Sequence, residues 1–100
     1  MRIIARHTLI EFAARNPKAR ASIERWYEIA RRANWTSPEA VQAAFSGAKA
    51  IDGERVRVEL HGGAFRLIVA FDFRRQVAFV KFLGTHAEND RIDARTVSMF

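Results

Sequence analysis

Three side chains that could act together on a phosphodiester stand in the apolar second half of the sequence. Arg66 lies within the apolar segment 65–73, Lys81 lies within the apolar segment 76–84, and His86 follows that second segment. Because burying an unpaired charge is expensive, cations inside apolar strands require a reason. A guanidinium and an ammonium stabilise the extra negative charge of a phosphate in a transition state, and an imidazole donates or accepts a proton. Together they predict phosphodiester cleavage without a metal.

The expected pairing of the two apolar segments brings these three side chains together. A turn between the segments predicts two antiparallel strands, so the start of the first strand lies beside the end of the second. We therefore expect Arg66, Lys81 and His86 to gather at one end of the sheet. A plainer interpretation stays open for each residue. A single His after a strand is more often a hydrogen-bonded loop residue, and a Lys near a strand end commonly extends to water.

No metal site or cofactor motif is recognisable in the rest of the sequence. His7, His61 and His86 lack the spacing of zinc ligands, and the chain contains no cysteine. The acidic residues within 88–93 lack the ligand pattern of a calcium loop, and no phosphate-binding glycine loop or nucleophile elbow is present. We therefore expect an activity that uses neither a metal nor a cofactor.

The first half of the sequence has a helical pattern. Thr8 and Glu11 have the spacing of a capping box, which predicts the start of a first helix. Apolar residues then recur every three or four positions and predict an amphipathic helix over 17–33. A third, short helix is expected over 38–45, with Ser37 as its cap and a proline at its first position.

After Gly47 the apolar period changes to two, which indicates strands. Strands are expected over 56–60, 65–73 and 76–84, with a glycine turn between the first two. Segment 65–73 is apolar on both faces and should be a central strand. The expected fold class is α+β: a small antiparallel sheet of three strands, or four where residues 2–4 join an edge, with two to three N-terminal helices packed on one face.

Length and composition indicate one domain over residues 1–100, because a chain this short has no room for a second core. The absence of cysteine fits a reducing compartment. The first residues form neither a signal peptide nor a membrane span, so we expect a cytoplasmic protein without a membrane partner.

The net charge of +6, from 17 basic and 11 acidic residues, favours nucleic acid or an acidic protein as partner. Most of the cations are arginines, whose planar guanidinium suits phosphate. The same composition can also serve solubility alone, and charge does not decide between the two. The cations expected to contact RNA or the ribosome are Lys18, Arg25 and Arg32, seven residues apart on one helix face, and Arg74 and Arg75 in the turn between the last two strands. A charged helix face is, however, more often simply solvated.

The sequence resembles the HigB family of RelE-like bacterial toxins over nearly the whole chain. The most specific part is the run Gly-Thr-His-Ala-Glu at 84–88, which follows an apolar strand that carries a cation. The other matching stretches are Met1 to Arg6, Trp26-Tyr27, Trp35 ahead of Pro38, and Gly62 to Leu67.

This resemblance implies a toxin that enters the ribosomal acceptor site and cuts messenger RNA, with the RNA 2′-hydroxyl as nucleophile. It also implies a cognate antitoxin that holds the toxin inactive, and contact with DNA only through the antitoxin complex. Arg66 would grip the scissile phosphate, Lys81 would add positive charge, and His86 would be the acid or base. The alternative is a non-catalytic basic module that only binds RNA, the ribosome or the antitoxin.

The sequence departs from the family pattern at three positions. Asn89 stands in the functional cluster where the family has Tyr, and Gly63 and Glu59 stand where it usually has Asn. Asn89 offers neither a stacking ring nor a phenolic proton. We therefore hypothesise that Asn89 attenuates the toxin, and that Asn89→Tyr raises toxicity sharply; equal growth inhibition by both versions would exclude this.

Overall fold

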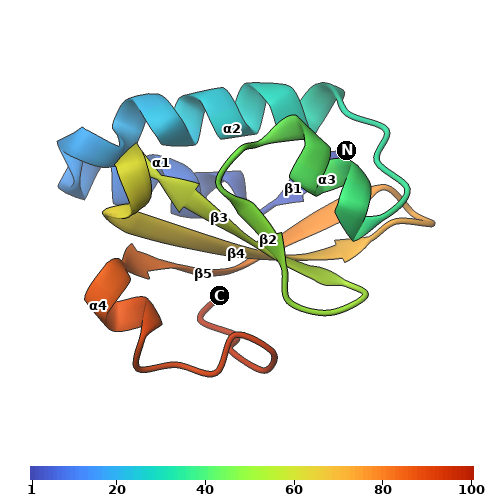
Figure 1. Cartoon of the computed structure of the whole chain (residues 1–100). Coiled ribbons are helices and arrows are strands. Elements are labelled where there is room, and N and C mark those ends of the chain that lie inside the picture. The colour runs from blue at the N-terminus through green and yellow to red at the C-terminus, as the bar shows by residue number, and fades with distance from the viewer.

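The computed structural model describes all residues, 1–100, as an α+β fold. A five-stranded mixed sheet has the strand order β1-β5-β4-β3-β2 and carries helices on one face (Figure 1). The elements are β1 (Arg2–Ile4), α1 (Arg6–Arg15), a 3-10 turn (Pro17–Ala19), α2 (Arg20–Arg32), α3 (Pro38–Ala44), β2 (Ala48–Ala50), β3 (Arg55–Leu60), a second 3-10 turn (His61–Gly63), β4 (Phe65–Asp72), β5 (Val77–Thr85) and α4 (His86–Asn89). No helix is both long enough and apolar enough to cross a membrane.

The expected antiparallel meander is confirmed as β3, β4 and β5, and β4 is the central strand. The first segment also joins the sheet, where β1 runs parallel to β5. The expected number of three or four strands was too low because β2 pairs with β3 as a fifth. Its sequence, Ala-Lys-Ala, has no bulky apolar residue to produce a strand pattern, so only its pairing with β3 defines it.

The start of α1 corrects one prediction. The helix begins at Arg6, its N-cap position is Ala5, and no side chain caps it. Thr8 is instead buried within the helix, so the expected capping box with Glu11 does not form. The helix expected over 17–33 is divided into the first 3-10 turn and α2. The cap of α3 is confirmed, since Ser37 Oγ accepts a hydrogen bond from the Ala40 N–H at 3.2 Å.

The main core lies between the sheet and the helices. Trp26 of α2 is 1% exposed and packs in the same cluster as Leu9 of α1 and Val41 of α3. From the sheet, Leu67 and Val69 of β4 are fully buried in this cluster. This burial of apolar area anchors α2 across the sheet, and α2 in turn supports the turn that follows β3.

The opposite face of the sheet is covered by the C-terminal segment, which follows α4 (Figure 1). Arg55 Nη1 donates hydrogen bonds to the carbonyls of Ala94 at 3.0 Å and Val97 at 2.7 Å. Ile68 and Phe82 are buried but lie outside the main core, so they form a second apolar layer on this face. Burial from both sides explains why β4 is apolar on both faces.

An irregularity in β5 sets the direction of Lys81. Ile68 pairs with Phe82, whereas the next residue of β4 pairs with Val80, so Lys81 is an extra residue on β5. Val80 and Leu83 both belong to the helix-side core. A bulge of this kind turns Lys81 and Phe82 toward the same face, the one that carries the C-terminal segment.

Candidate active site

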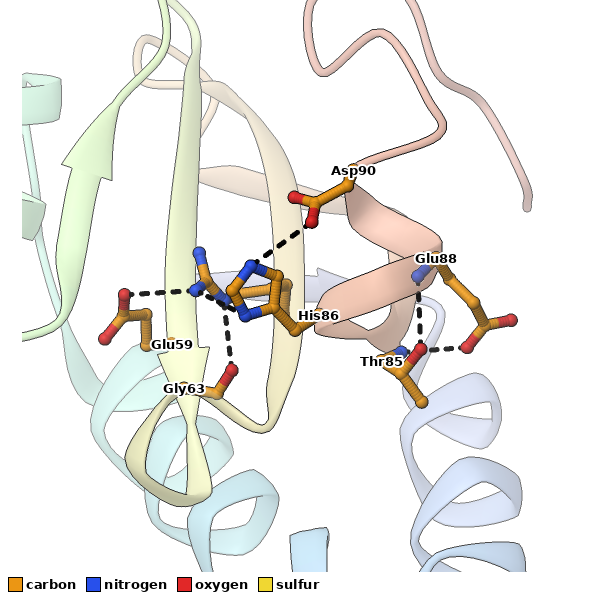
Figure 2. A network of polar contacts seen from close by, with 7 residues as sticks. Glu59, Gly63, Thr85, His86, Glu88 and Asp90 are labelled. Carbon is orange, nitrogen blue, oxygen red and sulfur yellow. Dashed lines mark hydrogen bonds and ion pairs between the residues drawn. The ribbon is translucent and has the colours of Figure 1, made fainter.

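The site lies at the end of the sheet where β4 begins and β5 ends, and Arg66 is at its centre. Arg66 stands in register with Gly84, and its side chain is only 11% exposed. Its Nε donates a hydrogen bond to the Gly63 carbonyl at 3.2 Å, and its Nη2 lies 3.5 Å from Glu59 Oε1 and 3.4 Å from His86 Nδ1 (Figure 2). Three different elements therefore hold one guanidinium in place.

His86 is positioned by the local structure of α4. Thr85 Oγ1 accepts a hydrogen bond from the Glu88 N–H at 3.1 Å, and Glu88 Oε1 accepts one from the Thr85 N–H at 2.8 Å, which is a capping box (Figure 2). The His86 N–H donates to the Ala64 carbonyl at 3.0 Å. A β-carbon at Gly84 would lie 3.1 Å from Glu88 Oε1 and 2.8 Å from the Phe82 ring. The glycine therefore leaves the space that the Glu88 side chain needs to reach the Thr85 N–H.

The contacts of the imidazole indicate its tautomer. His86 Nε2 lies 3.3 Å from Asp90 Oδ2, and Nδ1 faces Arg66. A guanidinium only donates and a carboxylate only accepts, so neutral His86 carries its proton on Nε2 and directs the lone pair of Nδ1 toward Arg66. The side chains of His86 and Asp90 are 56% and 64% exposed, so a substrate can reach this lone pair from solvent.

The turn before β4 fixes the other side of the site. His61, Gly62 and Gly63 have φ values of 50°, 64° and 91°, in the left-handed region that glycine adopts without strain. The His61 N–H donates to Ser22 Oγ of α2 at 3.0 Å, which ties the turn to the helix layer. The Gly63 carbonyl is thereby held where Arg66 Nε reaches it.

Lys81 does not join Arg66 and His86 in contact. It lies three residues before the position opposite Arg66, which corresponds to about 10 Å along a strand. Its Nζ lies 5.6 Å from the centroid of the Phe79 ring on the same strand. Of the three side chains expected to gather here, the structure brings Arg66 and His86 together and keeps Lys81 on the same face at a distance.

A comparison with protein-family models identifies the family. The model that matches is the HigB toxin, described as the RelE-like toxic component of a toxin-antitoxin system, and it spans residues 19–92. The chain belongs to the HigB toxin family. That range runs from α2 to beyond α4, so it includes every residue that holds Arg66 and His86. A HigB toxin has a cognate antitoxin as partner. No curated protein matches the chain.

Asn89 occupies an unexpected place in this HigB-family toxin. It is the last residue of α4 and is 7% exposed, although its place in the sequence predicts a catalytic residue. Its Oδ1 is buried without a hydrogen-bond partner, and it makes no hydrogen bond to Arg66 or His86. A catalytic role for Asn89 therefore stays a prediction without a contact to support it.

The cations expected to contact RNA lie in three separate places. Lys18 is exposed in the first 3-10 turn, Arg25 and Arg32 are exposed on α2, and Arg74 and Arg75 form the turn between β4 and β5, at the end of the hairpin away from Arg66. Their contact with RNA stays a prediction.

Most exposed arginines of the toxin's α2 are already paired. Arg20 Nε lies 2.9 Å from Glu24 Oε1, and Glu28 binds both Arg31 at 3.0 Å and Arg32 at 3.4 Å. The hydrogen bond from Arg31 lowers the pKa of the Glu28 carboxyl. Arg25, by contrast, has no carboxylate partner.

Two carboxylates of the site were not predicted as site residues. Glu59 stands directly opposite Arg66 in the pairing of β3 with β4, and Asp90 follows His86 by four residues on one helical turn. The spacing of His86 and Asp90 was visible in the sequence, since residues four apart on a helix are neighbours. The pairing of Glu59 with Arg66 could be predicted only from the register between β3 and β4. No three His, Asp or Glu side chains gather as metal ligands.

Proposed function

We propose that this HigB-family toxin is a cytoplasmic endoribonuclease that cuts messenger RNA on the ribosome, without a metal or cofactor. The observation that carries the proposal is the 3.4 Å approach of Arg66 Nη2 to His86 Nδ1 at a solvent-open end of the sheet. A fixed guanidinium beside an unprotonated imidazole nitrogen supplies the two functions that RNA cleavage requires, phosphate stabilisation and proton transfer.

In the proposed reaction, the ribose 2′-oxygen forms a bond to the adjacent phosphorus while the bond from phosphorus to the 5′-oxygen breaks. The 2′-hydroxyl loses a proton and the leaving 5′-oxygen gains one, so the products are a cyclic phosphate and a 5′-hydroxyl. His86 Nδ1 accepts a proton when neutral and donates one when charged. Arg66 stabilises the charge that develops on the phosphate oxygens.

Two carboxylates tune these groups in the proposal. Glu59 holds Arg66 at 3.5 Å in the absence of RNA, and a phosphate takes its place as the anionic partner. Asp90 keeps the proton of neutral His86 on Nε2 and stabilises the charged imidazole after it accepts a second proton. Asp90 therefore acts as a positioning residue, and Lys81 contributes positive charge from farther along the same face.

The decisive experiment incubates the protein with translating ribosomes and maps the 5′ ends of the messenger, with free RNA in parallel. We expect cuts confined to ribosome-bound messenger, and their loss in both Arg66→Ala and His86→Ala. Lys49→Ala, which removes an exposed cation outside the site, serves as the matched control.

The competing function is a non-catalytic module that only binds RNA, the ribosome or the antitoxin. Ribosome binding measured by co-sedimentation separates the two proposals. An enzyme keeps most of its binding in His86→Ala and loses cleavage, because one neutral imidazole contributes little to a large interface. Translation arrest that persists in both site variants without any cut messenger would establish the binding module instead.

A further inference from the structure

The candidate active site holds two proton acceptors on opposite sides of Arg66. Glu59 Oε1 lies 3.5 Å and His86 Nδ1 lies 3.4 Å from the same atom, Arg66 Nη2 (Figure 2). In the sheet, β4 lies between β3, which carries Glu59, and β5, which leads into His86. The carboxylate and the imidazole therefore approach one guanidinium nitrogen from its two sides, and a phosphate bound to that nitrogen lies within reach of both.

The proposed cleavage of RNA needs two proton transfers, and one imidazole performs only one of them at a time. The 2′-hydroxyl loses a proton as its oxygen attacks the phosphorus, and the 5′-oxygen gains one as it leaves. In an in-line displacement these two oxygens stand on opposite sides of the phosphorus. The base and the acid should therefore also stand on opposite sides, as Glu59 and His86 do.

The contacts of the neighbouring carboxylates leave Glu59 as the one that faces a phosphate on Arg66. Glu88 is engaged in the capping box of α4, where its Oε1 accepts a backbone N–H at 2.8 Å. Asp90 Oδ2 lies 3.3 Å from His86 Nε2, the ring nitrogen that does not face Arg66. Glu59 is thus the carboxylate of the site that is placed to accept a proton from the substrate.

The backbone around Glu59 makes room for its side chain beside Arg66. The Glu59 N–H donates to the Gly47 carbonyl at 2.9 Å, and a β-carbon at Gly47 would lie 2.9 Å from the Glu59 β-carbon. A larger residue at Gly47 would therefore displace Glu59. The Glu59 side chain is 44% exposed, and exposed ion pairs contribute little to stability, so a phosphate that replaces it on Arg66 readily frees the carboxylate.

We propose that Glu59 is the general base of the cleavage and that charged His86 is the general acid. This inference rests on the proposed cleavage of RNA and assigns its two proton transfers. Glu59 Oε1 takes the proton of the 2′-hydroxyl while the 2′-oxygen bonds to phosphorus. His86 Nδ1 gives its proton to the 5′-oxygen while the bond from phosphorus to that oxygen breaks. The family pattern usually has Asn at position 59, and an amide cannot act as a base, so the assignment concerns this chain.

The first test is Glu59→Gln, which keeps the shape of the side chain and removes its basicity. We expect kcat on programmed ribosomes to fall by about a hundredfold, because general-base catalysis contributes at least that much. Affinity for ribosomes that carry a 2′-O-methyl messenger, whose nucleophile is blocked, should stay the same or rise, since a negative charge beside the phosphate is lost. Glu59→Asp should recover part of the rate. Glu54→Gln, which removes the same charge next to the other end of β3, should cut normally.

A sulfur substitution then distinguishes the base from the acid. When sulfur replaces the 5′-oxygen at the cut, the leaving group is a thiolate, which is stable near neutral pH without a proton. We expect this messenger to restore the rate of His86→Ala to within about tenfold of the parent and to leave Glu59→Gln about a hundredfold slow. Rescue of Glu59→Gln to the same extent would overturn the assignment of Glu59 as the base.

The outcomes separate this inference from the proposed function. A parent protein that cuts no messenger, with oxygen or with sulfur at the cut, would reject the nuclease and the base with it. Normal cutting by Glu59→Gln would leave the nuclease standing and reject only the role of Glu59. A joint loss of rate, affinity and unfolding free energy in urea would show that Glu59 acts structurally, and would also overturn the assignment.

Discussion

The two ends of the β4–β5 hairpin both carry arginine, but they hold it in different ways. At one end the side chain of Arg66 is 11% exposed and is fixed by a carbonyl, a carboxylate and an imidazole. At the other end the side chain of Arg75 is 82% exposed and has only Asp72, at 3.9 Å. A fixed guanidinium can meet one phosphate in one geometry, whereas an exposed one attracts any phosphate nearby.

The difference comes from what lies beyond the strand ends. At the Arg66 end, the left-handed turn before β4 and the capped α4 after β5 are joined by the hydrogen bond from the His86 N–H to the Ala64 carbonyl. At the other end only a short turn joins the strands, and Arg74 and Arg75 extend to water. Charge alone therefore does not distinguish the end proposed to be reactive from the end that is only basic.

The largest expected effect is that of Arg66→Lys, which keeps the charge and removes the planar fork. We expect the cleavage rate on programmed ribosomes to fall by about a hundredfold or more, because an ammonium cannot keep all of the contacts of the guanidinium. Arg75→Lys at the exposed end should change the rate by less than about threefold. Similar losses in the two variants would contradict the distinction between the ends.

Asp90→Asn should have the next largest effect. General acid-base catalysis is worth about a hundredfold or more, and we expect this exposed partner to account for about tenfold of it. The loss should appear in kcat with KM nearly unchanged if Asp90 acts through its contact with His86. Asp90→Glu should restore part of the rate, and Asp93→Asn is the matched control. A change confined to KM would refute the positioning role.

Thr85→Ala and Ser37→Ala together compare the cap of α4, which carries His86, with the cap of α3, which carries no residue of the site. Loss of the Thr85 cap and loss of the Ser37 cap should each cost about 1 kcal/mol of unfolding free energy, measured with urea. Thr85→Ala should in addition lower the cleavage rate several-fold, since α4 carries His86, and Ser37→Ala should not. Equal activity of the two variants would mean that α4 does not need its cap to position the imidazole.

The two capping-box patterns show how far sequence reasoning reaches. Thr8 with Glu11 and Thr85 with Glu88 have the same spacing, yet only the second pair caps a helix. Thr8 is buried within a helix that already began at Arg6, just after β1. The local sequence pattern indicates which side chains can cap a helix, and the tertiary packing of the chain decides which of them do.

The meeting of Arg66 and His86 was predictable, because antiparallel pairing requires the start of β4 to lie beside the end of β5. The position of Lys81 was not. The bulge in β5 adds one residue where both faces of the strand are apolar, so the alternation carries no sign of it. Glu59 was also beyond the sequence, because its approach to Arg66 depends on the register between β3 and β4.

At the exposed end, the double variant Arg74→Ala with Arg75→Ala should weaken binding rather than chemistry. Each cation that contacts a phosphate contributes about one unit or less to the slope of log affinity against log salt concentration. We expect the slope for ribosome binding to become shallower by up to about two units, and the cleavage rate at saturating ribosomes to stay within about twofold. A steep loss of kcat would show that this end takes part in the reaction.

The smallest effect is expected at Asp52, which also lies at the end of the sheet away from Arg66. Asp52 Oδ1 accepts hydrogen bonds from the N–H groups of Glu54 at 2.9 Å and Arg55 at 2.8 Å, and these lower the pKa of its carboxyl from the ordinary 3.8. A carboxyl whose pKa is lower in the folded state contributes stability above its unfolded pKa and loses it as the pH falls through the folded pKa. Asp52→Asn should therefore be slightly less stable than the parent in urea at pH 7, and the difference should shrink below about pH 4. Because this turn holds no group of the site, cleavage should not change, and a constant difference at all pH values would show that the charge of Asp52 is not what stabilises the turn.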